Sequence, residues 1–380
     1  MRCGVSTTAM NYTAWPAFDH WEETGEWVDP PIPDYQIVQE DVEIGLLAES
    51  LGFDSLWAVE HHVTPYNMIT NTLQWLTYFA GATSRLDFGT MVVVLPWHHP
   101  VRVAEDIAML HNLLGEGRRL TVGLGRGAAR REFKALNIPM DESRDRFLEA
   151  LEIVRRALSQ DVFEFSGEYY QVPSSSIRPR PRDGQSLVDD MYCAWGSAQT
   201  IPIAANAGLK PLVIPQKSLD KYVDDLEQFA QLRGEGGHET AHPVVALSIY
   251  CAEDEAEARA GGLKYFTEYA DAAIRSYELA SRHFATTRGY EAYAQNAEAI
   301  LNRETMAKEM GAMWVDNHVW GTPEMCAEKI RTVAKLLNPA EIIMLPRVGD
   351  MPFDAALKSM RLFAREVLPA IHEIEAPASS

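Results

Sequence analysis

The sequence has few cysteines, no long apolar run and little positive charge. Its four cysteines, Cys3, Cys193, Cys251 and Cys326, form neither a CxxC pair nor a metal-ligand spacing, which predicts reduced thiols. No apolar run approaches the length that would cross a bilayer, and the first residues lack the apolar core of a signal peptide. These absences favour a cytoplasmic protein without a membrane partner.

Basic residues are outnumbered by acidic ones. The 380 residues include 34 lysines and arginines against 54 aspartates and glutamates, which gives a formal net charge of −20. Nucleic acids and anionic membrane surfaces both need a basic face on the protein that binds them, so neither is expected as a partner. What the chain does contain, 47% hydrophobic and 23% charged residues, is typical of an ordinary globular protein and suits an enzyme.

Strand patterns alternate with amphipathic helix patterns along most of the chain. Eight segments are predicted as strands: residues 3–7, 53–59, 86–95, 118–124, 191–195, 212–215, 244–251 and 341–345. Nearly all are followed by a predicted helix, the last of them over residues 353–371. This order predicts a parallel sheet, and eight units favour closure into a (β/α)8 TIM barrel over the alternative, an open doubly wound sheet.

Three stretches interrupt the alternation. We expect one domain over residues 1–375, with insertions of about 11–34, 159–187 and 254–313 after strands 1, 4 and 7. The prolines of 159–187 predict an irregular segment. The other two insertions are rich in aromatic residues and leave the catalytic rim of a barrel, so we expect lids or substrate walls there, with about half of the aromatics packing only within the insertions. Their content favours an apolar or aromatic substrate.

Four polar or glycine-rich clusters stand where predicted strands end. They are Glu60-His61-His62, His98-His99, Gly125-Arg126-Gly127 and Gly196-Ser197-Ala198-Gln199-Thr200. In a barrel the carboxyl ends of all strands meet at one rim, where catalytic groups gather. The sequence therefore predicts one site assembled from these clusters.

A phosphate-binding corner is predicted at the fourth and fifth strands. Ser197 and Thr200 lie where the fifth strand gives way to a helix, and Arg126 ends the neighbouring strand. Hydroxyls, free N–H groups and a guanidinium together can hold a phosphate monoester. Glycines such as Gly125 would let a ligand approach the backbone closely. The alternative is that Ser197 only caps the helix and Arg126 only pairs with a carboxylate.

The histidine pair is expected to serve catalysis rather than to bind a metal. Adjacent residues on an extended segment point to opposite sides, and no further histidine or carboxylate has zinc-type spacing to His61 and His62. A structural role for His61 is the alternative to a catalytic one. His98 and His99 are expected only to order the loop before Pro100, and no Walker loop, GxSxG or HExxH motif occurs.

The combination resembles the bacterial luciferase-like flavin monooxygenase family. The matching segments follow the family's order: Gly52 to Trp57 with Glu60-His61-His62, Leu95 to Arg102 with Ala104-Glu105-Asp106, Gly117-Arg118 with Gly123 to Gly127, Ser197 to Thr200, and Gly321 to Glu324. Luciferases themselves carry a glutamate before the serine of the fifth turn, where this chain has Gly196. A non-luminous oxygenase is therefore expected.

The resemblance implies a two-component monooxygenase. Such an enzyme binds reduced FMN non-covalently, receives it from a separate NAD(P)H:flavin reductase, and uses O2, through a flavin C4a-(hydro)peroxide, to oxygenate a small organic substrate. It implies that FMN is bound by five residues: Arg126, Gly125, Gly196, Ser197 and Thr200. It also implies that His61 acts at the reactive edge of the flavin, with His62 as its structural partner and Glu60 orienting the loop. Family members often form homodimers through helices that correspond to about 71–83 and 101–115.

Three alternatives stay open at this point. The same fold could use a reduced deazaflavin for hydride transfer without oxygen. The chain could be a flavin-binding protein without turnover. It could also be a metal-dependent barrel hydrolase that uses His61 and His62.

Overall fold

Eight parallel strands close into a barrel in this computed structural model, which describes residues 1–195, 198–291 and 303–377. The strands pair in the order β1-β2-β3-β4-β7-β8-β9-β11, and β11 returns to β1. Their bounds are β1 Arg2–Thr7, β2 Ser55–Ala58, β3 Asp87–Val94, β4 Leu120–Gly125, β7 Met191–Ala194, β8 Lys210–Val213, β9 Val244–Cys251 and β11 Glu341–Leu345. The predicted TIM barrel is confirmed, and the alternative of an open sheet is wrong.

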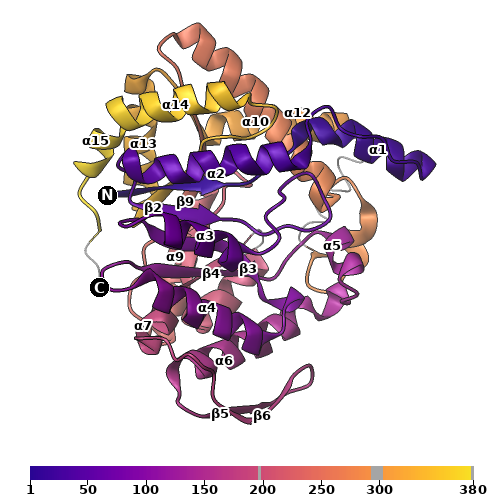
Figure 1. The fold of residues 1–380 in the computed structure, drawn as a ribbon, viewed down its shortest axis with the longest axis vertical. Helices are drawn as coiled ribbons and strands as arrows, with labels where there is room; N and C mark the ends of the chain where they lie inside the picture. Colours follow the sequence, from indigo (N-terminus) through magenta and orange to yellow (C-terminus); the bar gives the residue numbers. More distant parts are fainter. Residues whose placement is uncertain (196–197, 292–302, 378–380) are drawn as a thin grey trace.

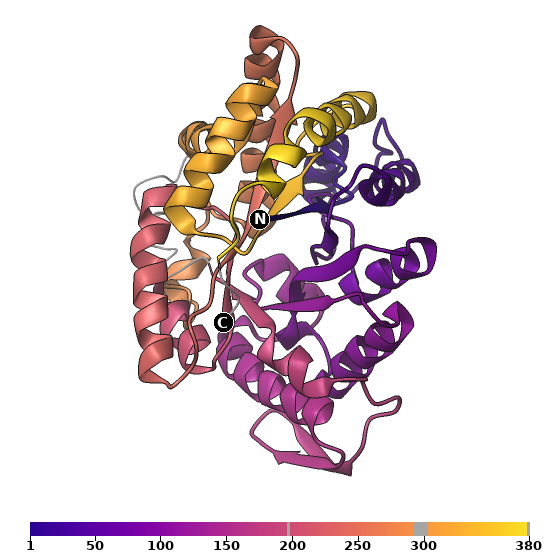
Figure 2. The same cartoon turned by 90° about the vertical axis from the view of Figure 1, so that its left-hand side faces the viewer.

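Helices follow the strands and cover the outside of the barrel (Figures 1 and 2). They are α2 Asp34–Ser50, α3 Thr72–Ala82, α4 Pro100–Leu114, α6 Ser143–Ser159, α8 Ile201–Asn206, α9 Leu219–Glu235, α13 Pro323–Leu337 and α14 Phe353–Glu366. The last predicted helix is interrupted, because α14 ends before α15 Leu368–His372. Pro369 in the first turn of α15 has no N–H to continue the hydrogen bonding of α14. In the described part of the chain, no helix is long and apolar enough to cross a membrane.

The first and third predicted insertions contain helices. Residues 11–34 hold η1 Tyr12–Ala14 and α1 Trp15–Thr24, and Figure 1 shows α1 projecting from one side of the molecule. Residues 254–313 hold α10 Glu255–Tyr277, η5 Arg282–Thr286 and the start of α12 Arg303–Asn317. The strand β10 Val319–Gly321, which pairs with β9, was not predicted, since three residues are too few to show strand alternation. Short helices also occupy the loops after the strands: η2 Leu95–Trp97, α5 Arg130–Ala135, η3 Met140–Glu142 and η4 Ala198–Thr200.

The second insertion is more regular than its prolines predict. It forms an antiparallel hairpin of β5 Phe163–Ser166 and β6 Gln171–Ser175, followed by α7 Gly184–Asp189. Pro173 lies in β6 where the register shifts, a place at which its missing N–H breaks no ladder bond. Figure 1 shows this hairpin at the end of the molecule opposite α10 and α12, so it lies far from the helices of the third insertion.

A hydrogen-bonded polar group closes the barrel at the amino ends of its strands. Arg2 donates to Asp87 over 2.6 Å and to Glu341 over 3.5 Å. Ser55 donates to Glu341 and accepts from the indole N–H of Trp57 over 2.8 Å. Each of these five side chains has partners, so this end of the barrel is filled and satisfied rather than open.

Candidate active site

A cavity opens among the carboxyl ends of the strands. It has about 1400 Å³ of empty space, its open mouth included, and its walls come from the ends of β2, β3, β4, β7 and β8 and from α10 and α12. Five of the predicted site residues line it: Glu60, His61, Gly125, Arg126 and Thr200. His62 stands beside the cavity without lining it, and Gly196 and Ser197 lie outside the described residues.

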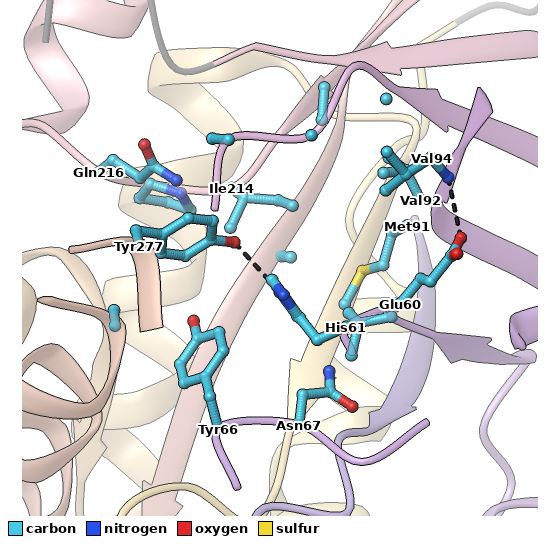
Figure 3. A pocket seen from close by; sticks show the side chains of 18 of the residues that line it. Glu60, His61, Tyr66, Asn67, Met91, Val92, Val94, Ile214, Gln216 and Tyr277 are labelled. Atoms are coloured by element: carbon cyan, nitrogen blue, oxygen red, sulfur yellow. Dashed lines mark hydrogen bonds between the residues drawn. The ribbon is translucent and has the colours of Figure 1, made fainter. Parts of the chain in front are cut away.

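His61 is held from both sides of its ring. Its Nδ1 lies 2.9 Å from Glu132 Oε1, and its Nε2 lies 3.1 Å from the hydroxyl of Tyr277, which points at it from α10 (Figure 3). An ionised carboxylate can only accept, so Nδ1 carries the hydrogen and the Tyr277 hydroxyl donates to Nε2. Nε2, the nitrogen bonded to Tyr277, is therefore the hydrogen-bond acceptor of the ring, and Nδ1 is its donor.

Glu132 is a site residue that the sequence analysis missed. It lies on α5, 71 residues from His61, and is completely buried. Its Oε1 also accepts the backbone N–H of His62 over 2.8 Å, while Oε2 has no hydrogen-bond partner among the described residues. Nothing in the sequence around it distinguishes this glutamate from a surface residue of a short helix.

Tyrosines of the third insertion and of the loop after β2 build an aromatic wall beside His61. Tyr66 and Tyr277 meet its ring edge-on, with centroids 4.9 and 5.4 Å away. Tyr269 stacks on Tyr66 at 5.7 Å. All three line the cavity. In residues 11–34, Phe18 instead meets Trp15, Trp21 and Trp27 edge-on, and no aromatic residue of this segment lines the cavity.

Glu60 joins the ends of β2 and β3. Its Oε1 accepts from His62 over 3.0 Å and from His98 over 2.6 Å, and its Oε2 accepts the N–H of Val94 over 2.9 Å (Figure 3). Burial alone would raise the pKa of Glu60, but these hydrogen bonds outweigh it and hold the pKa below its ordinary value. For His98, burial lowers the pKa, but the Glu60 carboxylate outweighs that and raises it. His98 thus does more than order its loop.

Glu60, His62 and His98 are also a set that could hold a metal ion, because one ligand atom of each lies within 4.8 Å of the others. His61 is not part of this set, and His98 comes from the segment after β3, a proximity that spacing along the chain does not reveal. The nitrogen–oxygen distances of 2.6 and 3.0 Å are those of hydrogen bonds, so the cluster is satisfied without an ion.

Arg126 lines the cavity and is held by the segment around Gly289 and Tyr290. Its guanidinium lies 4.1 Å from the centre of the Tyr290 ring, and Nη2 donates to Gly289 O over 2.9 Å. Its Nη1 is buried without a hydrogen-bond partner among the described residues, and it forms no ion pair with any of them. The pKa of the Glu291 carboxyl is lowered mainly by the backbone N–H of Gly289 and also by the positive charge of Arg126, so the alternative of an Arg126–carboxylate pair stays open.

The glycines beside Arg126 are needed for packing. A Cβ on Gly125 would lie 2.3 Å from the side chain of Val92, so glycine lets β4 approach β3. Gly127 adopts a φ of +77°, and a Cβ there would lie 2.9 Å from Trp97. Close contact between neighbouring strands is thus a sufficient reason for Gly125, in addition to the predicted approach of a ligand.

The luciferase-like monooxygenase family model matches residues 20–337, and the chain belongs to this family. The resemblance found in the sequence is thereby confirmed. Among characterised relatives, the alkanal monooxygenase alpha chain of Photorhabdus luminescens is 25% identical over 353 residues, which cover 90% of this chain and 95% of the relative.

Two solved structures show the same fold. The oxygenating constituent of 3,6-diketocamphane monooxygenase from Pseudomonas putida, a type II Baeyer–Villiger enzyme solved with FMN, is 20% identical, covers 99% of each chain and has a TM-score of 0.72. A secondary alcohol dehydrogenase that depends on coenzyme F420 is 14% identical, covers 98% of this chain and 99% of its own, and has a TM-score of 0.67. Proteins of this fold therefore include one solved with FMN and one that depends on coenzyme F420.

Proposed function

We propose that the protein is the oxygenating component of a two-component monooxygenase, which takes reduced FMN from a separate NAD(P)H:flavin reductase and uses O2 to oxygenate a small apolar or aromatic substrate. The observation that carries this proposal is that His61 and Arg126, an imidazole and a guanidinium, line one cavity with largely apolar walls. An imidazole and an anion anchor at one cavity suit a cofactor that has a reactive ring and a phosphate.

The cavity fits FMN on two grounds. It is walled by the carboxyl ends of several barrel strands, which is where barrel enzymes bind their ligands. The buried Nη1 of Arg126 has no partner among the described residues, and a phosphate oxygen would satisfy it. Thr200 lines the same cavity and would assist from η4.

The protein's own residues would position the cofactor and the substrate and would transfer the proton. Bound reduced FMN supplies the electrons that activate O2 for transfer of one oxygen atom to the substrate. His61 Nε2 would give or take the accompanying proton, the Tyr277 hydroxyl would hold this nitrogen in place by its hydrogen bond, and Glu132 would fix the orientation of the imidazole. The tyrosine wall and the apolar ends of β3 and β8 would keep water away from the reacting atoms.

We also propose a cytoplasmic homodimer. Three large apolar side chains are exposed on α3 and α4: Tyr78 of α3 by 55%, and Met109 and Leu113 of α4 by 46% and 53%. Such a surface favours contact with a second copy of the chain. Sedimentation equilibrium should give twice the mass of one chain; a single-chain mass across the accessible concentrations would exclude the dimer.

The phosphate anchor is tested by comparing FMN with riboflavin, which lacks the phosphate. Wild-type protein should bind FMN more tightly, and Arg126→Gln should lose about 10- to 100-fold in FMN affinity, since a hydrogen bond to a charged group contributes about 1.5–3 kcal/mol. Riboflavin affinity should change little. Arg102→Gln, an exposed arginine on α4, is the matched control. Equal wild-type affinities for both flavins would contradict the proposal.

The reaction itself is tested with enzymatically reduced FMN and O2 over aromatic, terpenoid and ketone substrates, with products detected by mass. A product heavier by one oxygen atom from labelled O2 is the expected result. Because a solved structure of the same fold uses coenzyme F420, the anaerobic reaction with reduced F420 is run in parallel. Turnover there and none with FMN would favour hydride transfer instead.

A further inference from the structure

Three buried polar side chains on the far wall of the cavity have atoms without partners. They are Ser248 of β9, Trp314 of α12 and His318 just after α12, with exposed fractions of 0, 4 and 5%. All three line the cavity that holds His61 and Arg126. Ser248 Oγ, Trp314 Nε1 and His318 Nε2 have no hydrogen-bond partner in the described part of the chain. Buried polar atoms are rarely left unpaired, so these three atoms are candidates for pairing with a ligand.

The hydrogen bonding of His318 fixes which of its nitrogens carries the hydrogen. The backbone N–H of Ser248 donates to His318 Nδ1 over 3.0 Å, so Nδ1 is an acceptor. Burial lowers the pKa of His318 to about 3, so the ring is neutral at any working pH. A neutral imidazole with an accepting Nδ1 must carry its hydrogen on Nε2. The unpaired atom is therefore an N–H donor.

Trp314 supplies a second donor of the same kind. An indole N–H can only donate, and that of Trp314 also lacks an acceptor among the described residues. The Trp314 ring meets Tyr269 at 4.7 Å and His318 at 5.5 Å, both edge-on, so packing fixes both donor rings. Phe266 supports His318 from behind at 5.6 Å. Two fixed donors and one hydroxyl are thus held ready for an acceptor.

The location of the donors separates them from the predicted cofactor anchor. Tyr66, Tyr269 and Trp314 form a continuous run of ring contacts that leads from His61 to His318. The charged side chains that line the cavity, Glu60, Arg126 and Glu132, come from the ends of β2 and β4 and from α5 instead. The far wall is apolar and aromatic apart from these uncharged donors.

We propose that Trp314 and His318, assisted by Ser248, bind an uncharged carbonyl-type oxygen of the substrate. This inference deepens the proposed function. It rests on that function because only an enzyme would bind the compound as a substrate. A pure hydrocarbon would leave both donors unpaired, and a carboxylate would find no cationic side chain among the described residues that line this wall. The substrate class is therefore a cyclic or aromatic compound that carries a ketone, quinone or amide oxygen, bound so that its body lies along the tyrosine wall.

The test measures binding, independently of turnover. Affinities are measured by calorimetry, with and without FMN, for two ketones and their deoxygenated counterparts: 1-tetralone against tetralin, and acetophenone against ethylbenzene. Wild-type protein should prefer the ketone by roughly tenfold or more, because a site built to pair a polar group rejects the analogue that lacks it. Equal affinities within both pairs, or no binding of all four compounds, would overturn the proposal.

Two variants assign the preference to the donors. Trp314→Phe removes one N–H and keeps an aromatic ring, and His318→Asn keeps an acceptor for the Ser248 N–H while removing the donor at the Nε2 position. Each should reduce the preference for ketones severalfold while hydrocarbon affinity changes little. Trp320→Phe is the control, since its indole donates to Val315 O and it does not line the cavity. A preference that survives in both site variants would overturn the assignment, whereas failed turnover with intact ketone binding would count only against the oxygenase proposal.

Discussion

The two ends of the barrel differ in how they treat buried polar groups. At the amino ends of the strands, Arg2, Ser55 and Glu341 are tied together, and none of their side chains has a buried atom without a partner. At the carboxyl ends, Glu132 Oε2 and Arg126 Nη1 are buried without partners among the described residues. The closed end therefore contributes to stability, whereas the open end retains polar groups that only a ligand can satisfy.

The contrast shows that the free energy available for binding a ligand lies at the carboxyl ends of the strands. An unpaired buried polar atom costs about 1–3 kcal/mol, so the open end lowers the stability of the ligand-free protein. A ligand that pairs these atoms recovers that free energy as affinity and orientation. The same polar residue types thus serve stability at one end and recognition at the other, and variants at the two ends should separate the two quantities.

The largest effect is expected for His61→Ala at the open end. Loss of a positioned proton carrier lowers turnover by about 100- to 10,000-fold, while the free energy of unfolding changes little. Single-turnover product formation with reduced FMN and O2, together with urea unfolding, measures both. His111→Ala, a histidine on α4 outside the cavity, is the control and should retain activity. Full activity of His61→Ala would remove this residue from the mechanism.

Glu132→Gln should have the next largest effect. The amide oxygen can still accept from His61 Nδ1 and from the His62 N–H, but the negative charge that favours a protonated ring is lost. We expect kcat to fall about tenfold, the size of one charge-assisted interaction, with unchanged binding of FMN and substrate. The exposed Glu105→Gln on α4 is the matched control. If KM instead changed about tenfold and kcat did not change, Glu132 would be a structural residue only.

The sequence was sufficient for the barrel but not for the contacts within the site. Strand 341–345 and strand 244–251 were predicted with their observed bounds, because apolar runs flanked by turn residues mark strands buried on both faces. The alternation of strands with helices then determines the topology. His61 and Arg126 were placed on one rim by that topology alone, and both line the observed cavity.

Contacts across the chain could not be predicted in the same way. Glu132 reaches His61 from 71 residues away, and His98 reaches Glu60 from the next strand. Trp314 lies in α12 and His318 directly follows it, so the position of both over the cavity depends on how α12 packs against α10. Periodicity reports which face of an element is buried, not which distant side chain meets it there.

At the closed end, Arg2→Met should change stability and not catalysis. Arg2 pairs with Asp87 and Glu341 but is about a third exposed, so we expect a loss of about 1–2 kcal/mol, between the values for exposed and buried pairs. Burial raises the pKa of Glu341, which Arg2 counteracts. Ionisation of this carboxyl therefore costs stability as the pH rises, and more so without Arg2.

Urea unfolding of Arg2→Met and wild type should consequently show a larger stability difference at pH 7.5 than at pH values near the ordinary carboxyl pKa of 4.5. Turnover per folded molecule should be the same for Arg2→Met and wild type at both pH values. A loss of activity without a loss of stability would mean that the amino end of the barrel is not separate from the site.

The smallest effect concerns the Glu60–His98 pair, the satisfied part of the open end. The pKa of His98 is raised, so its contribution to stability is complete below the ordinary value of 6.5 and is lost as the pH rises through the folded value. The pKa of Glu60 is lowered, so its contribution is complete above 4.5 and is lost only on stronger acidification. His98→Gln keeps a donor and removes the charge. The free energy of unfolding of wild type should therefore exceed that of His98→Gln by up to about 1 kcal/mol at pH 5.5. At pH 8.5 the two free energies should be nearly equal.

Unfolding in urea with a chelator present, so that no metal competes for His98, measures this difference. The same difference in the free energy of unfolding at both pH values would show that the Glu60–His98 pair stabilises the protein through its hydrogen-bond geometry and not through the charge of His98. A gap that appears only when the chelator is omitted and zinc is added would instead show that Glu60, His62 and His98 bind an ion. In that case the Glu60, His62 and His98 cluster would also depend on a bound ligand. The contrast with the amino ends of the strands, where Arg2 lies, would then hold for the whole rim.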